Sequence, residues 1–136
     1  MASTIFITGA SRGFGKIWAE ALLQRGDRVV ATARDVSALD DLVSEYGGNV
    51  LALQLDVNDR DADITSISKA KEHFGNIDVL INNAGYGLFG AIEEITEKEA
   101  RQQMEANFFG CCGFRKQYCL SCESREMAIS SNCQAY

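Results

Sequence analysis

A glycine-rich run near the amino terminus is the part of this 136-residue sequence best suited to chemistry. It reads Thr8-Gly9-Ala10-Ser11-Arg12-Gly13-Phe14-Gly15, and it joins an apolar segment typical of a buried strand, residues 3–8, to a helical pattern. Helix N-termini carry unpaired amides and about half a positive charge, so such a run can bind a pyrophosphate. We expect Gly9 to permit a tight turn, Gly13 to let the anion approach the backbone, and Gly15 to let helix and strand pack closely. The alternative is an ordinary glycine-rich turn.

Three further polar motifs lie where strands are predicted to end or on a later helix. Asp56-Val57 closes one predicted strand, Asn82-Asn83-Ala84-Gly85 closes the next, and Asn107 lies on a predicted helix beyond them. Each motif alone has an ordinary structural interpretation, because Asp at a strand end caps turns and Asn and Gly are common turn residues. Their order along the chain is what makes them informative.

The glycine run has the spacing T-G-x-x-x-G-x-G, which resembles that of the short-chain dehydrogenase/reductase family rather than the general G-x-G-x-x-G. The other three motifs follow in that family's order, and the resemblance covers residues 1–110. It implies hydride transfer between a nicotinamide cofactor and a small carbonyl or alcohol substrate. It also implies that Asp56 contacts the adenine ring and that Asn107, the one catalytic residue we assign, binds a water in the proton relay. The residues assigned to the cofactor are Gly9, Ser11, Arg12, Gly13, Phe14, Gly15, Arg34, Asp56, Val57, Asn83, Ala84 and Gly85.

The choice between NAD and NADP depends on the residues after a predicted strand at 28–33. An acid there would bind the ribose 2′-hydroxyl and favour NAD, and Asp35 is a candidate. The position that carries this acid in the family corresponds to Ala33, however, and Arg34 follows it. Arg34 and Arg12 can converge on a 2′-phosphate, to which guanidinium groups donate charge-assisted hydrogen bonds. We therefore predict NADP, with NAD less favoured; the alternative is two solvated surface arginines.

The family's remaining catalytic residues are expected after the fourth helix: a Ser on the fifth strand, then a Tyr with a Lys four residues later. The sequence contains no Tyr-x-x-x-Lys, because Tyr118 is followed four residues later by Cys122 and Tyr136 is the last residue. Ser130 and Ser131 are present, but no Tyr-Lys pair follows them. We therefore expect this chain to be inactive alone. Its substrate is not indicated, although the loop at 85–90 is a candidate pocket entrance.

The alternation of elements predicts an α/β fold, a Rossmann-like doubly wound parallel sheet that is incomplete, with about four strands and flanking helices. Strands are predicted over residues 3–8, 28–33, 50–56 and 77–82, and Thr96 with Glu99 is a predicted capping box. The residues expected to face inward are Ile17, Ala21 and Leu22 on the first helix, Leu39, Leu42 and Val43 on the second, Ile64, Ile67 and Phe74 on the third, and Ala100, Met104 and Phe108 on the fourth.

The charge and hydropathy of the chain argue against several classes of partner. The net charge of −6 disfavours nucleic acid and anionic membranes as main partners. No run approaches the roughly 20 apolar residues that span a bilayer, and the first residues do not resemble a signal peptide. We therefore expect a cytoplasmic protein.

The cysteines divide the sequence into two parts. Residues 1–110 contain none, whereas all five lie within residues 111–136. Reverse translation of this tail, read one base back, permits a string that resembles the family's continuation, with Val-Leu-Pro, Gly-His-Phe-Ile and a Ser-Ser pair. We hypothesise a dinucleotide-binding half-domain, 1–110, followed by an out-of-frame tail, 111–136.

The alternative is a non-enzymatic nucleotide-binding or zinc-binding interaction fragment, in which Cys119 and Cys122 form a C-x-x-C with Cys111, Cys112 and Cys133 nearby. Because the tail is not expected to continue the fold, we expect the fourth strand to end the sheet as an unpaired edge. We then expect a marginally stable chain, in which the family's homo-oligomer is doubtful.

Overall fold

The computed structural model describes residues 1–91, 93–121 and 127–130, and a parallel sheet forms its centre. The strands are β1 (Thr4–Thr8), β2 (Arg28–Ala33), β3 (Val50–Gln54), β4 (Val79–Asn82) and β5 (Met127–Ser130). Their order across the sheet is β3-β2-β1-β4-β5, and every pair is parallel. The reversal of strand order beside β1 is the doubly wound arrangement that the alternating elements predict.

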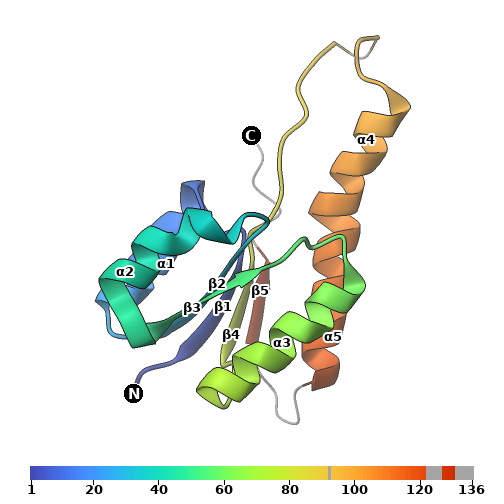
Figure 1. Ribbon diagram of the computed structural model, residues 1–136. Helices are drawn as coiled ribbons and strands as arrows, with labels where there is room; N and C mark the ends of the chain where they lie inside the picture. The colour runs from blue at the N-terminus through green and yellow to red at the C-terminus, as the bar shows by residue number, and fades with distance from the viewer. Residues whose placement is uncertain (92, 122–126, 131–136) are drawn as a thin grey trace.

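Helices cover both faces of the sheet. The longer ones are α1 (Gly13–Gln24), α2 (Asp40–Tyr46), α3 (Arg60–Phe74), α4 (Glu97–Met104) and α5 (Cys111–Ser121). Short turns form η1 (Val36–Leu39), η2 (Gly47–Asn49) and η3 (Glu105–Gly110), and η3 is a π-helix that joins α4 to α5. Figure 1 shows α1 and α2 on one face of the sheet, and α3 with the α4–α5 helix on the other. The predicted fold class is confirmed.

The sheet extends one strand further than the sequence analysis predicts. The expectation that β4 forms an unpaired edge is wrong, because β5 pairs with it in register from Val79↔Met127 to Asn82↔Ser130. The tetrapeptide Met-Ala-Ile-Ser of β5 lacks the run of apolar β-branched residues that marks the other strands in the sequence.

Residues 111–121 also form part of the packed fold. Phe114 and Tyr118 on α5 are buried, and the Phe114 ring lies 5.0 Å from the ring of Phe6 on β1. The Tyr118 hydroxyl donates a hydrogen bond of 3.1 Å to the carbonyl oxygen of Ile77. The segment expected to be aberrant therefore contributes two aromatic residues to the core.

The inward face of α1 differs from the expected one. Gly15, Ala19 and Leu23 are buried, whereas Ile17 is 56% exposed and Ala21 lies on the surface. The cause is the contact of Gly15 with the glycine loop, which fixes the rotation of the helix about its axis.

The later helices differ from expectation at single positions. Leu39, Leu42 and Ile67 are buried as expected, but Val43 and Ile64 are exposed. Met104 and Phe108 are also about half exposed. The wide turn of η3 begins after Met104 and shifts the helical phase at Phe108. The capping box is confirmed: the Glu99 amide donates to the Thr96 side chain at 3.3 Å, and the Thr96 amide donates to the Glu99 carboxylate at 2.9 Å.

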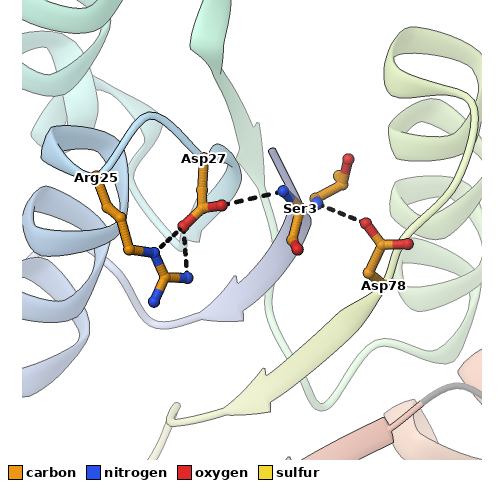
Figure 2. A network of polar contacts seen from close by, with 5 residues as sticks. Ser3, Arg25, Asp27 and Asp78 are labelled. Atoms are coloured by element: carbon orange, nitrogen blue, oxygen red, sulfur yellow. Dashed lines mark hydrogen bonds and ion pairs between the residues drawn. The ribbon is translucent and has the colours of Figure 1, made fainter. Parts of the chain in front are cut away.

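Two carboxylates anchor the amino end of β1, at the edge of the sheet opposite the glycine loop (Figure 2). Asp27 is only 4% exposed; it accepts a hydrogen bond of 3.0 Å from the Ser3 amide and one of 2.6 Å from Arg25 Nε. Asp78 accepts a bond of 2.8 Å from the Thr4 amide. These contacts complete the hydrogen bonding of β1 beyond its ladder partners.

Candidate functional site

A cleft of about 910 Å³ lies at the carboxyl ends of the strands. Ligands of open α/β sheets bind at this edge, beside the point where the strand order reverses. All of the expected cofactor-binding residues except Gly15 line the cleft. Tyr86, in the loop at 85–90 that was a candidate pocket entrance, also lines it. The sequence analysis assigned no cofactor contact to the remaining lining residues, which are Ala33, Leu55, Asn58, Gln102, Glu105 and Ala106.

The glycine loop has the conformation that its residue types require. Gly9 and Gly13 have φ angles of +71° and +58°, in the left-handed region that favours glycine. A Cβ atom on Gly15 would overlap the carbonyl oxygen of Gly9 and the side-chain amide of Asn83, so close packing excludes any other residue there. At Gly13 a Cβ atom would meet nothing within 4 Å, so its backbone faces open space at the cleft.

The N-terminus of α1 points its first amides at this cleft. Its N-cap residue, Arg12, makes no capping hydrogen bond through its side chain, and no acidic residue lies in the first turn. The amides that a helix leaves unpaired at its start therefore have no side-chain acceptor here. This end of α1 can accept an anion such as a pyrophosphate.

The Asn-Asn-Ala-Gly segment after β4 is tied to the glycine loop. The Thr8 hydroxyl accepts hydrogen bonds from the amides of Asn83, at 2.9 Å, and Ala84, at 3.0 Å. The Asn83 side-chain amide donates to the Gly9 carbonyl at 2.9 Å. Thr8 is therefore a structural member of the site that the sequence analysis missed, because its partners lie some 75 residues away in the chain.

Asn107 lies beside the cleft and holds a residue that lines it. Its Oδ1 accepts from the Tyr86 amide at 2.8 Å, and its Nδ2 donates to the Tyr86 carbonyl at 2.7 Å. Gln103 adds a longer bond, of 3.3 Å, to the same carbonyl. The side chain that the family resemblance assigns to a proton relay thus also positions the loop after β4.

Of the residues considered for the choice between NAD and NADP, some line the cleft and one does not. Arg12 and Arg34 are exposed and line the cleft, and neither forms an ion pair within the described residues. Asp35 does not line it; its carboxylate accepts hydrogen bonds from the side chain and the backbone amide of Ser37, at 2.7 and 3.0 Å. These bonds from Ser37 lower the pKa of Asp35 and engage the carboxylate in capping η1.

Tyr118, the tyrosine considered for catalysis, lies outside the cleft lining. Tyr118 is buried in the core, with its hydroxyl bound to a backbone carbonyl. Ser130 ends β5 opposite Asn82, so its backbone stands at the carboxyl edge of the sheet, and Ser131 lies outside the described residues.

The described ranges hold no cluster of three or more residues suited to a metal ion, and no helix among them could cross a membrane. Cys112 and Cys119 are exposed thiols, and Cys111 is partly buried. The other cysteines of the zinc alternative, Cys122 and Cys133, fall outside the described residues.

The sequence and the structure both match one family of proteins. The family model of short chain dehydrogenases matches residues 3–121 and so continues past Gly110. Oxidoreductase BOA17 of Botryotinia fuckeliana is 44% identical over 111 residues, which are 81% of this chain and 40% of that protein.

Solved structures of short-chain dehydrogenases are also similar to this chain. A short-chain dehydrogenase from Streptomyces avermitilis is 40% identical, with a TM-score of 0.83 over 88% of this chain and 44% of that one. A structure described as ElxO with NADP bound is 31% identical, with a TM-score of 0.79 over 88% of this chain and 50% of that one. The chain thus spans half or less of the length of these proteins. Sequence, fold and cleft agree that this chain belongs to the short-chain dehydrogenase family.

Proposed function

We propose that this chain binds NADP in the cleft at the carboxyl edge of its sheet. The observation that carries the proposal is the convergence there of the glycine loop, the end of β2, the loop after β3 and the segment after β4. The site fits a dinucleotide because the N-terminal amides of α1 lack side-chain acceptors and the backbone at Gly13 faces open space. The first turn of α1 would hold the pyrophosphate, with the loop after β3 beside the adenosine.

The preference for NADP over NAD rests on charge. Arg12 and Arg34 are exposed cations on the cleft, whereas Asp35, the residue that would favour a ribose 2′-hydroxyl, caps η1 and does not line the cleft. A 2′-phosphate would give the two guanidinium groups a dianionic partner. The related ElxO structure contains NADP, which supports the same choice.

The reaction that we propose for the intact family member is the oxidation or reduction of a small alcohol or carbonyl compound. The bound cofactor supplies or accepts the hydride. We propose that Asn107 positions both the loop at Tyr86 and a water of the proton relay. The 136 residues contain no Tyr-x-x-x-Lys, and Tyr118 is buried with its hydroxyl bound to the Ile77 carbonyl. We therefore propose that this chain binds the cofactor without turning it over.

The binding proposal is tested by titrating the chain into NADPH and into NADH and following dihydronicotinamide fluorescence. We expect NADPH to bind at least tenfold more tightly, because each arginine adds a charge-assisted contact of roughly 1.5–3 kcal/mol. Arg34→Ala should reduce this preference about tenfold while leaving NADH binding nearly unchanged. Arg115→Ala, which removes an exposed arginine of α5 outside the cleft lining, is the matched control. Equal affinity for the two cofactors would contradict the proposed selectivity, and no binding of either would contradict the function.

The proposal that residues 111–136 are out of frame is tested at the nucleotide level. We expect the shifted frame to remain open and to encode a downstream Tyr-x-x-x-Lys. A protein made from that frame should oxidise NADPH with carbonyl substrates, whereas the present chain should not. Early stop codons in the shifted frame would refute this proposal.

A further inference from the structure

A hydrogen bond joins the start of α3 to the π-helical turn that carries Asn107. Arg60, the first residue of α3, donates from Nη2 to the carbonyl oxygen of Phe109 on η3 at 3.0 Å, although the two residues are 49 positions apart in the chain. Figure 1 shows the start of α3 beside the helix that α4 and α5 form together. The guanidinium of one helix thus binds the backbone of the other.

The helix surface has room for the guanidinium at this point because glycine lies beneath it. A Cβ atom on Gly113, a buried residue of α5, would coincide with Arg60 Nη1, so any larger residue would displace the guanidinium. Gly110 is also closely packed, because a Cβ atom there would lie 2.8 Å from the Val57 carbonyl oxygen. The loop after β3 and the start of α3 therefore pack directly on η3 and the beginning of α5.

The form of η3 determines the direction in which Asn107 points. The core fixes α5 through the buried side chains of Phe114 and Tyr118. A π-helical turn holds one residue more than an α-helical turn, which rotates the residues before it by about 100° relative to those after it. Asn107 lies within this turn and binds the Tyr86 backbone at 2.8 and 2.7 Å. Relaxation of the turn to an ordinary α-helix would therefore rotate Asn107 away from Tyr86.

We infer that Arg60 is a positioning residue of the cofactor cleft, which holds η3 in its π-helical form and so keeps Asn107 on the loop at Tyr86. Arg60 does not line the cleft, so it acts on the site through the helix. It does so through the Phe109 carbonyl, two residues after Asn107 on the same turn. The importance of this loop for nucleotide binding rests on the proposed function, whereas the link from Arg60 to Tyr86 does not.

The test measures the exchange of single backbone amide hydrogens with solvent, by NMR on the full chain. We expect Arg60→Met to lower the protection of the Tyr86 amide about tenfold, the effect of one hydrogen bond from a charged group. Gly113→Ala should have the same effect by displacing the guanidinium, and it should leave the chain as stable as before, because alanine favours a helix more than glycine does.

Two further variants separate this contact from other effects of Arg60. The chain that carries both Arg60→Met and Gly113→Ala should lose no more protection at Tyr86 than either single variant, because both changes remove the same contact. Arg60→Lys keeps a cationic donor near the buried Asp63 and should retain part of the protection that Arg60→Met loses.

Lys69→Met is the matched control, since it removes an exposed cation from the same helix. It should leave the Tyr86 amide unchanged. The amides of Ser3 and Thr4, which bind carboxylates at the opposite edge of the sheet, should keep their protection in every variant. If these two amides lose protection together with Tyr86 in Arg60→Met, Arg60 only stabilises the fold and the inference is wrong.

NADPH titration completes the test. We expect Arg60→Met and Gly113→Ala to weaken NADPH binding about three- to tenfold, as the loss of one hydrogen bond would. Unchanged protection of Tyr86 in Arg60→Met overturns the inference, and so do additive losses in the double variant or an NADPH affinity that does not fall when Tyr86 loses protection. Failure of the unsubstituted chain to bind NADPH would overturn the proposed function, and the exchange measurement would still decide whether Arg60 positions Tyr86.

Discussion

The side chain of Asn107 binds both backbone groups of Tyr86, accepting from its amide at 2.8 Å and donating to its carbonyl at 2.7 Å. Tyr86 lines the cleft and belongs to the loop that follows β4, whereas Asn107 lies on the π-helical turn η3. The pair therefore fastens a loop without regular structure to a rigid helix. Loops of cofactor sites need such supports, because their own backbone groups have no ladder partners.

Replacing Asn107 with Leu should free this loop. We expect NADPH affinity to fall about five- to tenfold and the free energy of unfolding to fall by roughly 1–3 kcal/mol, since the Tyr86 amide loses its acceptor and the Tyr86 carbonyl keeps only the longer bond from Gln103. Fluorescence titration and urea unfolding measure the two effects. Gln103→Ala removes only the single longer bond to Tyr86 and is the control. Unchanged affinity in the Asn107 variant would show that the loop is held by other contacts.

Substitution of Gly15 by Ala should be the most damaging single-methyl change in the site. The new methyl group would overlap the Gly9 carbonyl and the Asn83 side chain, so α1 must move away from the sheet. We expect a loss of about 3 kcal/mol or more in unfolding free energy, together with the loss of NADPH binding. Gly48→Ala is the control, because nothing lies within 4 Å of its Cβ position and its φ is not positive. A Gly15→Ala chain that melts like the parent would contradict the close packing described above.

The buried carboxylate of Asp63 on α3 lowers the free energy of unfolding by an amount that depends on pH. Its side chain is fully buried, and neither carboxylate oxygen has a hydrogen-bond partner among the described residues. Burial raises the pKa of Asp63 from 3.8 to about 7; the nearby Arg60 acts in the opposite direction, and Asp59 and Asp56 add to the increase. The pKa of Asp63 is higher in the folded chain than in the unfolded chain. The resulting loss of unfolding free energy is therefore absent below about pH 4, grows up to about pH 7 and is constant above it.

Asp63→Val should therefore stabilise the chain at pH 8 by an amount on the order of 2–4 kcal/mol and have little effect at pH 4. Urea unfolding at pH 4, 6 and 8 measures this difference. Asp61→Asn changes an exposed carboxylate of the same helix and should not alter the pH dependence. If the parent and Asp63→Val lose stability in parallel between pH 4 and 8, another group is responsible.

The carboxylate of Asp27 should stabilise the fold by binding the amino end of β1. Asp27→Ala leaves the Ser3 amide without its acceptor and removes the ion pair with Arg25, whose Nη2 lies 2.5 Å from Asp27 Oδ2 (Figure 2). We expect a loss of roughly 1–3 kcal/mol in unfolding free energy, because the carboxylate is almost fully buried. Asp41→Ala, which breaks a 3.7 Å ion pair between exposed groups, should cost less than about 1 kcal/mol. Equal costs for the two variants would contradict this assignment.

Local sequence predicted much of this protein. The four apolar runs, the glycine loop and the box of Thr96 and Glu99 follow from interactions between residues close together in the chain, which is why they could be inferred. Helix faces were predicted less well: Ile17 and Val43 fit an apolar stripe but are exposed. An apolar period does not fix the rotation of a helix about its axis, which for α1 depends on the close packing of Gly15 against the glycine loop.

The sequence by itself determined the cofactor loop, because the conformation at Gly9 and Gly13 is a property of glycine and the helix N-terminus follows directly. Only the tertiary structure decided what surrounds that loop. It set Asn107 against Tyr86 and brought Glu105 to the lining of the cleft. It also paired β4 with β5 and buried Phe114 and Tyr118. These contacts join residues far apart in the chain, so they depend on the order of the strands and the rotation of the helices. Short sequence patterns determine neither of these.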